Sequence, residues 1–191
     1  MLSTGDLVLN IYVFALGILW ALVMASAEGP IGWGGNGNIM KSNKWLFNCL
    51  KLFTFGRPLH PLPLFAIITF TISFAFPAIW NYSKDLPFSV LAWGELVAYF
   101  ALFAIHEDFI WFLVNPHFGL KKFNKIDAAW HPRWFLGLPI DYWIGISVFG
   151  LFGFLGRGLN WVILTGITQL ILVLITTLVL GKLMDYKKIT E

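Results

Sequence analysis

The chain has 191 residues, of which 58% are hydrophobic, 18% aromatic and only 12% charged. A soluble domain carries about 25% charged and about 45–50% apolar residues, so this composition excludes a water-soluble monomer and a disordered chain. The formal charge of +3 does not indicate nucleic-acid binding, because the basic residues lie beside apolar segments. The single cysteine, Cys49, excludes an intrachain disulfide. The class indicated is an integral membrane protein.

Five apolar stretches approach the length of about 20 residues that a membrane-spanning helix needs. They are residues 7–27, 62–80, 88–114, 140–155 and 161–180. The first stretch has an acid, Asp6, in front of it and exceeds the length of a signal-peptide core, so we interpret it as a retained helix. Residues 41–55 place lysines three to four positions apart among apolar residues, which predicts an amphipathic helix at the membrane surface.

The basic residues indicate the orientation of these helices in the membrane. One side holds Lys41, Lys44, Lys51, Arg57, Lys121, Lys122, Lys125, Arg133, Lys182, Lys187 and Lys188, and the other side holds only Lys84 and Arg157. Because cytoplasmic loops are rich in Lys and Arg, the N-terminus is expected outside and the C-terminus inside. We therefore predict an all-α integral membrane protein of the plasma membrane, one domain over residues 1–191 with five transmembrane helices.

The third predicted helix, residues 88–114, contains ionisable residues that membrane helices normally avoid. Such residues cost about 2.5–3.5 kcal/mol near the membrane centre and usually face protein or water. At 100° per residue, Glu95, Tyr99 and His106 share one face of this helix, whereas Glu107 and Asp108 are rotated away from it. Their place inside an apolar segment makes them candidates for a functional site.

A second group of polar and aromatic residues follows, and residues 106–143 are predicted to form a cytoplasmic cap. Three of the four histidines in the chain, His106, His117 and His131, fall within 26 residues of one another. Imidazole and carboxylate groups are ligands of zinc, iron and manganese, which favours a divalent metal site. The predicted metal ligands are His106, Glu107, His117 and His131.

The same cluster supports two interpretations without a metal. In the first, His106, Glu107, Asp108 and His131 are catalytic groups or bind a lipid-like substrate, because an imidazole titrates near neutral pH. In the second, the cluster is a network that locks the cap, with Glu107 or Asp108 held by Arg133 or a lysine.

Polar residues also line the last predicted helix, where Thr165, Gln169 and Thr176 share a face and are expected to bond Glu95 across helices. Glu95, Tyr99, Gln169 and Arg133 are therefore the candidate substrate- or ion-binding residues. Arg157 has no expected role beyond the topology.

Residues His106 to Gly145, HEDFIWFLVNPHFGLKKFNKIDAAWHPRWFLGLPIDYWIG, carry three spaced patterns. These are Glu-Asp-Phe-x-Trp-Phe-x-x-Asn-Pro, Trp-His-x-x-Trp and Pro-x-Asp-Tyr-Trp. With these patterns the segment resembles a group of small prokaryotic membrane proteins. The resemblance covers about a fifth of the chain and implies no particular activity. The resemblance implies a prokaryotic membrane protein.

The segment His131–Gly137 also resembles the Arg-His-Pro-x-Tyr-x-Gly signature of isoprenylcysteine-type membrane methyltransferases. That resemblance implies S-adenosylmethionine as a cofactor. It departs from the signature at three places, because Trp130 replaces the Arg, Trp134 replaces the Tyr and Gly137 comes one residue late.

Three functions follow as hypotheses from these observations. The first is a membrane-embedded enzyme or binding site for a lipid-like substrate at the inner leaflet. The second is a non-catalytic structural or assembly subunit, which is expected to bind a partner subunit or form an oligomer. The third is a small proton- or cation-coupled transporter that uses Glu95. All three have membrane lipids as partners.

Overall fold

The computed structural model describes residues 2–28 and 90–190, without the side chains of residues 26–28, 90–92 and 182–190. These residues belong to one compact unit, Met1–Pro30 with Phe88–Glu191. The second unit, Ile31–Pro87, lies outside the described residues. The predicted span at residues 62–80 and the predicted surface helix at residues 41–55 fall in that second unit.

The described residues are mostly helical. The helices are α1 (Thr4–Glu28), α4 (Val90–Val114), α5 (Ile140–Arg157) and α6 (Leu159–Thr190). A short 3-10 helix, η2 (Leu120–Lys122), and a two-stranded antiparallel hairpin, β1 (Trp134–Phe135) with β2 (Leu138–Pro139), lie between α4 and α5. The predicted all-α class is confirmed.

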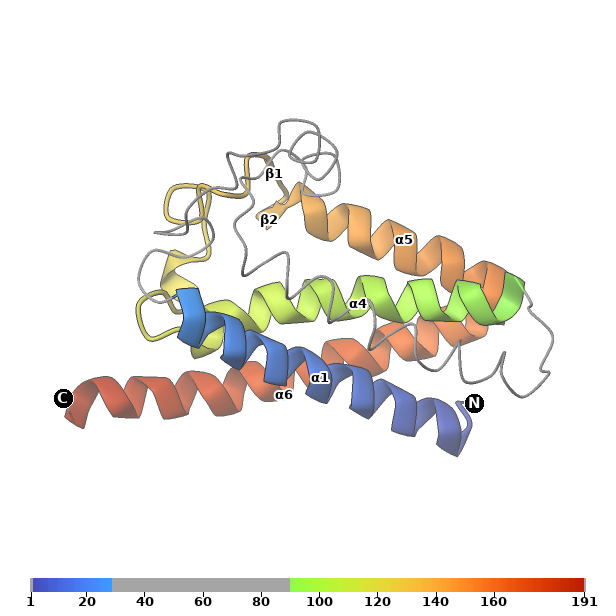
Figure 1. Cartoon of the computed structure of the whole chain (residues 1–191), viewed down its shortest axis with the longest axis horizontal. Helices are drawn as coiled ribbons and strands as arrows, with labels where there is room; N and C mark the ends of the chain where they lie inside the picture. The colour runs from blue at the N-terminus through green and yellow to red at the C-terminus, as the bar shows by residue number, and fades with distance from the viewer. Residues whose placement is uncertain (1, 29–89, 191) are drawn as a thin grey trace, which may run out of the picture. The chain divides into compact units, whose positions relative to one another are not determined.

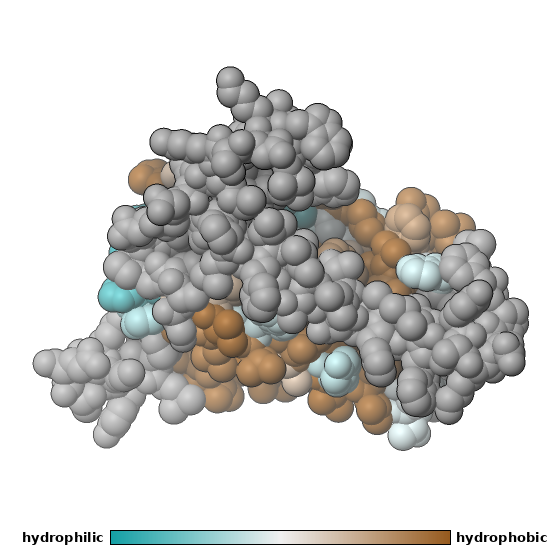
Figure 2. Space-filling view, in the orientation of Figure 1, coloured by the Kyte–Doolittle hydropathy of each residue, from teal (hydrophilic) through white to brown (hydrophobic). Residues whose placement is uncertain are grey.

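Three of the described helices are long and apolar enough to cross a membrane. The segments are Thr4–Ala25, Trp93–Val114 and Leu159–Gly181. They confirm the helices predicted at residues 7–27, 88–114 and 161–180, and their surfaces expose large apolar side chains, as Figure 2 shows. The predicted fourth span corresponds to α5, whose 18 residues extend about 27 Å.

Contacts between residues establish the directions of α1 and α5 relative to α4. Asn10 of α1 lies beside Tyr99 of α4, and Gly17 lies beside His106, so seven residues along one helix match seven along the other. Helix α1 therefore runs parallel to α4. Helix α5 runs antiparallel to α4, because Gly94 faces the end of α5 and Ile105 faces Gly145 near its start. Figure 1 shows α4 with α5 on one side and α1 with α6 on the other.

Glycines allow α4 and α5 to approach closely at two levels. A Cβ atom on Gly94 would lie 2.8 Å from the carbonyl oxygen of Phe152, and one on Gly145 would lie 2.8 Å from Cδ1 of Ile105. Small residues at helix contacts are typical of membrane bundles, because lipid provides no hydrophobic drive for association. Helix α5 then passes into α6 through Gly158 alone, whose φ of 82° is accessible to glycine.

The irregular part of the predicted cap is shorter than residues 106–143. Residues 106–114 continue α4 as helix, and residues 140–143 form the first turn of α5. We call the segment between them, residues 115–139, the cap. Its hairpin turns at Leu136 and Gly137, whose φ values of 47° and 80° make a two-residue type I′ turn.

Candidate functional site

Aromatic rings fix the cap against the last turns of α4. Trp130 packs on Trp111 with ring centroids 5.6 Å apart and stacks on Phe112 at 5.7 Å. Phe123 contacts Phe112 at 5.0 Å and Phe109 at 5.5 Å. Because these contacts reach back to residue 109, the cap lies beside the end of α4 and does not simply extend beyond it.

His131 stands between two carboxylates from different helices. Its Nε2 atom lies 3.1 Å from Oδ2 of Asp108 on α4, an ion-pair distance without hydrogen-bond alignment. Its Nδ1 atom lies 3.2 Å from Oδ2 of Asp141 in the first turn of α5. The hydroxyl of Tyr142 donates to the same Asp108 oxygen at 2.8 Å. We call Asp108, His131, Asp141 and Tyr142 the His131 cluster.

The two carboxylates limit the protonation states that the His131 cluster can adopt. A neutral imidazole carries one N–H group, whereas both ring nitrogens of His131 face carboxylate oxygens. The arrangement is therefore satisfied by an imidazolium ring or by a protonated carboxyl group. In either state His131 ties the cap to α4 and α5 at once.

The ring of His131 is closed to a substrate. Only 1% of its side chain is exposed, and Trp134, Trp130 and Tyr142 surround it with ring contacts near 6 Å. The indole nitrogen of Trp134 also donates to the His131 carbonyl oxygen at 3.1 Å. A general base must reach the proton that it removes, so this enclosure favours a positioning role.

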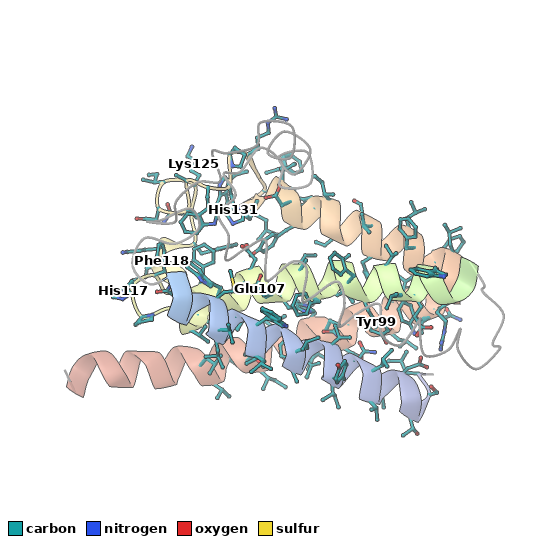
Figure 3. All side chains as sticks on the ribbon, viewed as in Figure 1. Tyr99, Glu107, His117, Phe118, Lys125 and His131 are labelled. Atoms are coloured by element: carbon teal, nitrogen blue, oxygen red, sulfur yellow. The ribbon has the colours of Figure 1, made fainter. Side chains whose placement is uncertain are left out.

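The other predicted histidines lie elsewhere. His106 faces α1, where its ring meets Phe14 edge-on at 5.2 Å, and its buried Nδ1 atom has no hydrogen-bond partner among the described residues. His117 is exposed at the end of α4, and its backbone N–H donates to Oδ1 of Asn115. Figure 3 shows His117 and His131 well separated on the cap. The structure does not bring the three histidines together.

The remaining predicted residues of this end also take separate positions. Glu107 is partly buried on α4, and at 100° per residue it points in a different direction from its neighbour Asp108. Arg133 is exposed at the start of the hairpin, and its carbonyl oxygen accepts from the Ile140 N–H. Arg133 or a lysine was expected to hold Glu107 or Asp108, whereas Asp108 lies against His131 and Tyr142. Within residues 2–28 and 90–190, no three His, Cys, Asp or Glu side chains are grouped to hold a metal ion.

A second polar group lies at the opposite end of the helices. Arg157, the last residue of α5, donates to Oδ1 of Asp6 on α1 at 2.6 Å and to Oε2 of Glu95 on α4 at 3.1 Å. The indole nitrogen of Trp161 on α6 donates to the same Asp6 oxygen at 3.3 Å. We call these residues, Asp6, Glu95, Arg157 and Trp161, the Arg157 cluster. It links the four described long helices.

Hydrogen bonds continue from the Arg157 cluster into the helix bundle. The Asn10 amide donates to the Asp6 carbonyl oxygen and to the Tyr99 hydroxyl, at 2.8 and 3.1 Å. The Gln169 amide donates to Oδ1 of Asn10 at 2.7 Å. Gln169 therefore bonds Asn10 rather than Glu95, which corrects the expected contact across helices. Thr165 is fully buried beside this group, and Thr176 lies two turns further along α6.

The sequence patterns missed several residues that make these clusters. Arg157 was explained by topology alone, Asp6 was used only in deciding that the first helix is retained, and Asn10 was not considered. An acid and an arginine at the same predicted membrane side nevertheless form a pair of opposite charges. Asp141 and Tyr142 follow Pro139 in one of the spaced patterns. Asp141 contacts His131, ten positions earlier, whereas Tyr142 bonds Asp108, 34 positions earlier.

The chain was compared with protein-family models, curated proteins and solved structures, and none of them matches it.

Proposed function

We propose that the protein crosses the membrane five times, with its N-terminus outside and its C-terminus inside. Helices α1 and α4 run in the same direction, so the chain must return across the membrane between them if both are spans. The apolar stretch at residues 62–80 lies in that interval. Helix α5, antiparallel to α4, supplies the fourth crossing. The four basic residues of the cap favour its placement on the cytoplasmic side.

We infer that the protein is a non-catalytic structural or assembly subunit of a prokaryotic cell membrane, whose cap is locked onto the helix bundle. The observation that supports this function is the position of His131, which is buried with each ring nitrogen against a carboxylate. Fixing the backbone of one loop residue costs about 1–2 kcal/mol of conformational entropy. A loop that is held in one conformation at this cost is therefore expected to have a shape that matters for function. A rigid cap suits the binding of a partner subunit.

The geometry of the His131 cluster supports a metalloenzyme less well. The two nitrogens of an imidazole point away from each other, so Asp108 and Asp141 lie on opposite sides of the ring. One metal ion cannot be bound by His131 and both carboxylates at a spacing of about 2.0–2.2 Å. The resemblance to membrane methyltransferases has similarly little support. His131, which belongs to the segment that carries it, is buried inside the fold and does not face a cofactor site.

A transporter that uses Glu95 has similarly little support. The Glu95 carboxylate is bound by Arg157, which is also bound to Asp6. An ion or proton that needed this carboxylate would have to displace a cation that is always charged. Glu95 is better explained as a link between α4 and α5.

The proposed lock can be tested with the full chain in detergent. His131→Leu should lower the Tm by several degrees and expose the cap to trypsin at Lys121, Lys122, Lys125 and Arg133, because two partly buried carboxylates lose the imidazole between them. The exposed His117→Leu is the matched control and should change neither quantity. Unchanged Tm and cleavage in His131→Leu would contradict the lock. A stoichiometric divalent metal that is lost in His131→Leu would favour the enzyme instead.

A further inference from the structure

The tip of the β1–β2 hairpin combines an unfavourable backbone conformation with apolar side chains that are exposed. Leu136 has a φ of 47°, in the left-handed region that a leucine rarely adopts. Asparagine or aspartate normally precedes the glycine of such a turn, because it tolerates this conformation. Leu136 is also 75% exposed and its neighbour Phe135 is 56% exposed. A polar residue would serve the turn better if water surrounded the tip.

The position of the hairpin along α4 indicates that lipid rather than water surrounds its tip. His131, three residues before the hairpin, contacts Asp108, which precedes the end of α4 by six residues or about 9 Å of helix. The indole nitrogen of Trp143, in the first turn of α5, donates to the Phe135 carbonyl oxygen at 2.9 Å. The hairpin therefore lies at the level of the last turns of the apolar segment Trp93–Val114.

Basic residues flank the apolar tip. Phe123 contacts Trp134 with ring centroids 5.3 Å apart, which places the η2 segment next to β1. The exposed cations of this region are Lys121, Lys122, Lys125 and Arg133. Figure 3 shows Lys125 projecting from the cap on the side away from α4. Apolar side chains bordered by Lys and Arg are typical of surfaces that enter the headgroup layer of an anionic membrane.

We propose that the cap is embedded in the cytoplasmic leaflet, with Phe135 and Leu136 among the acyl chains of the lipids. Lys121, Lys122, Lys125 and Arg133 bind the phosphate groups of anionic glycerophospholipids around them. This inference rests on the proposed membrane orientation but not on the assembly role. Hydrocarbon around the tip explains both the exposed apolar side chains and the use of leucine where asparagine or aspartate would tolerate the turn, because a polar side chain would lose its hydration there.

Site-directed fluorescence tests the position of the tip. The full chain, with Cys49→Ser, is placed in lipid nanodiscs after Leu136→Cys and labelling with an environment-sensitive dye. Brominated acyl chains should quench this dye and aqueous iodide should not. A dye at Asp127→Cys, an exposed acidic position of the same cap, should show the reverse. Phe135→Cys is a second probe of the tip that leaves the left-handed position unchanged.

The identity of the lipid is tested with the same labelled protein. Brominated phosphatidylglycerol should quench the dye at position 136 more strongly than brominated phosphatidylcholine. A Lys or Arg near a membrane surface contributes up to about a five-fold preference for anionic lipid, so Lys125→Gln or Arg133→Gln should lower the preference by up to that factor. Lys187→Gln with Lys188→Gln, in the C-terminal part of α6, should leave it unchanged. Soluble glycerol phosphate should not compete, because it lacks the acyl chains.

Three results would overturn the proposal. Quenching of the tip dyes by iodide as strong as at position 127 would place the tip in water. Shielding from both iodide and brominated lipid would indicate a protein partner in place of lipid. Equal quenching by the two lipids would remove the role of the basic residues. The trypsin and Tm measurements on His131→Leu are made in detergent without added lipid, so a failure of the proposed lock is recognised separately.

Discussion

The two ends of the helix bundle carry polar clusters of similar composition that connect different parts of the structure. The Arg157 cluster joins residues of four helices through an arginine whose side chain is 37% exposed. The His131 cluster joins one loop to two helices through a histidine whose side chain is 1% exposed. Each cluster places one basic residue between two acids.

The difference lies in what each basic residue holds. Arg157 is always charged and has five N–H donors, so it can serve two carboxylates from a partly exposed position at the end of α5. His131 has only two nitrogens and is sealed by aromatic rings, so its contacts determine where the cap lies. We infer that the Arg157 cluster stabilises the whole bundle and that the His131 cluster stabilises the cap.

Arg157→Met should have the largest effect on the stability of the bundle. It removes both ion pairs and leaves Asp6, only 7% exposed, without its cation. Loss of one partner of a buried pair costs about 3–5 kcal/mol, and the partial exposure of Arg157 favours the lower value. Titration with a denaturing detergent, followed by circular dichroism, measures this loss.

The control for Arg157→Met is Arg133→Met, which removes an exposed arginine of the cap. The two variants should differ strongly in unfolding midpoint. If Arg157→Met exposed the cap to trypsin without lowering the midpoint, the assignment of the Arg157 cluster to the bundle would be wrong.

Helix positions and polar faces were predictable from the sequence because they depend on local patterns. The α1, α4 and α6 helices match the predicted stretches, and Tyr99 and Glu95 do form polar contacts across helices as their shared face indicates. His106 lies on the same face but meets Phe14 of α1 instead. Periodicity gives the direction of a side chain but not the residue that it meets.

The partners themselves could not be predicted, because they depend on the path of the chain. Arg157 meets Asp6 across 151 positions, and Asp108 meets Tyr142 across 34. The clustering of His106, His117 and His131 in sequence suggested a common site, whereas the fold of residues 115–139 separates them. That path is set by aromatic packing, which no spacing of polar residues reveals.

Substitutions of two glycines compare the helix contact near each end. Gly94→Ala near the Arg157 cluster would press a Cβ atom on a backbone carbonyl oxygen, which cannot move independently of α5. Gly145→Ala near the His131 cluster would press its Cβ atom on Cδ1 of Ile105, the end of a flexible side chain. Overpacking costs about 1–3 kcal/mol, so Gly94→Ala should lie near the upper value and Gly145→Ala near the lower. Gly150→Ala should cost nothing, because no other described side chain or helix lies within 4 Å of the added Cβ. Equal losses for Gly94→Ala and Gly145→Ala would show that both contacts can relax.

Asn10→Ala tests the hydrogen bonds below the Arg157 cluster. The Asn10 side chain contacts Tyr99 on α4 and Gln169 on α6, and its loss leaves the Gln169 amide without its closest acceptor. Interhelical hydrogen bonds in membranes average about 0.6 kcal/mol and reach about 1.7, so the midpoint should fall by about that amount. Asn160→Ala, at an exposed position of α6, should have no effect. A loss in Asn10→Ala as large as that of Arg157→Met would mean that the buried amides, rather than the ion pairs, hold the bundle.

Tyr142→Phe should have the smallest effect on the unfolding midpoint. It tests whether the position of the cap depends on the contacts of Asp108 with both Tyr142 and His131. The variant keeps the ring that packs on Phe123 and removes only the hydroxyl that donates to Asp108. A single hydrogen bond contributes about 0.5–1.5 kcal/mol, and a donor to a carboxylate lies at the higher value. Because this bond orients Asp108 toward His131, trypsin cleavage of the cap should rise measurably while the unfolding midpoint of the bundle changes little. Tyr12→Phe, at an exposed position of α1, is the matched control. A fall in the midpoint without faster cleavage would show that the two ends of the bundle unfold together and would remove the distinction between them.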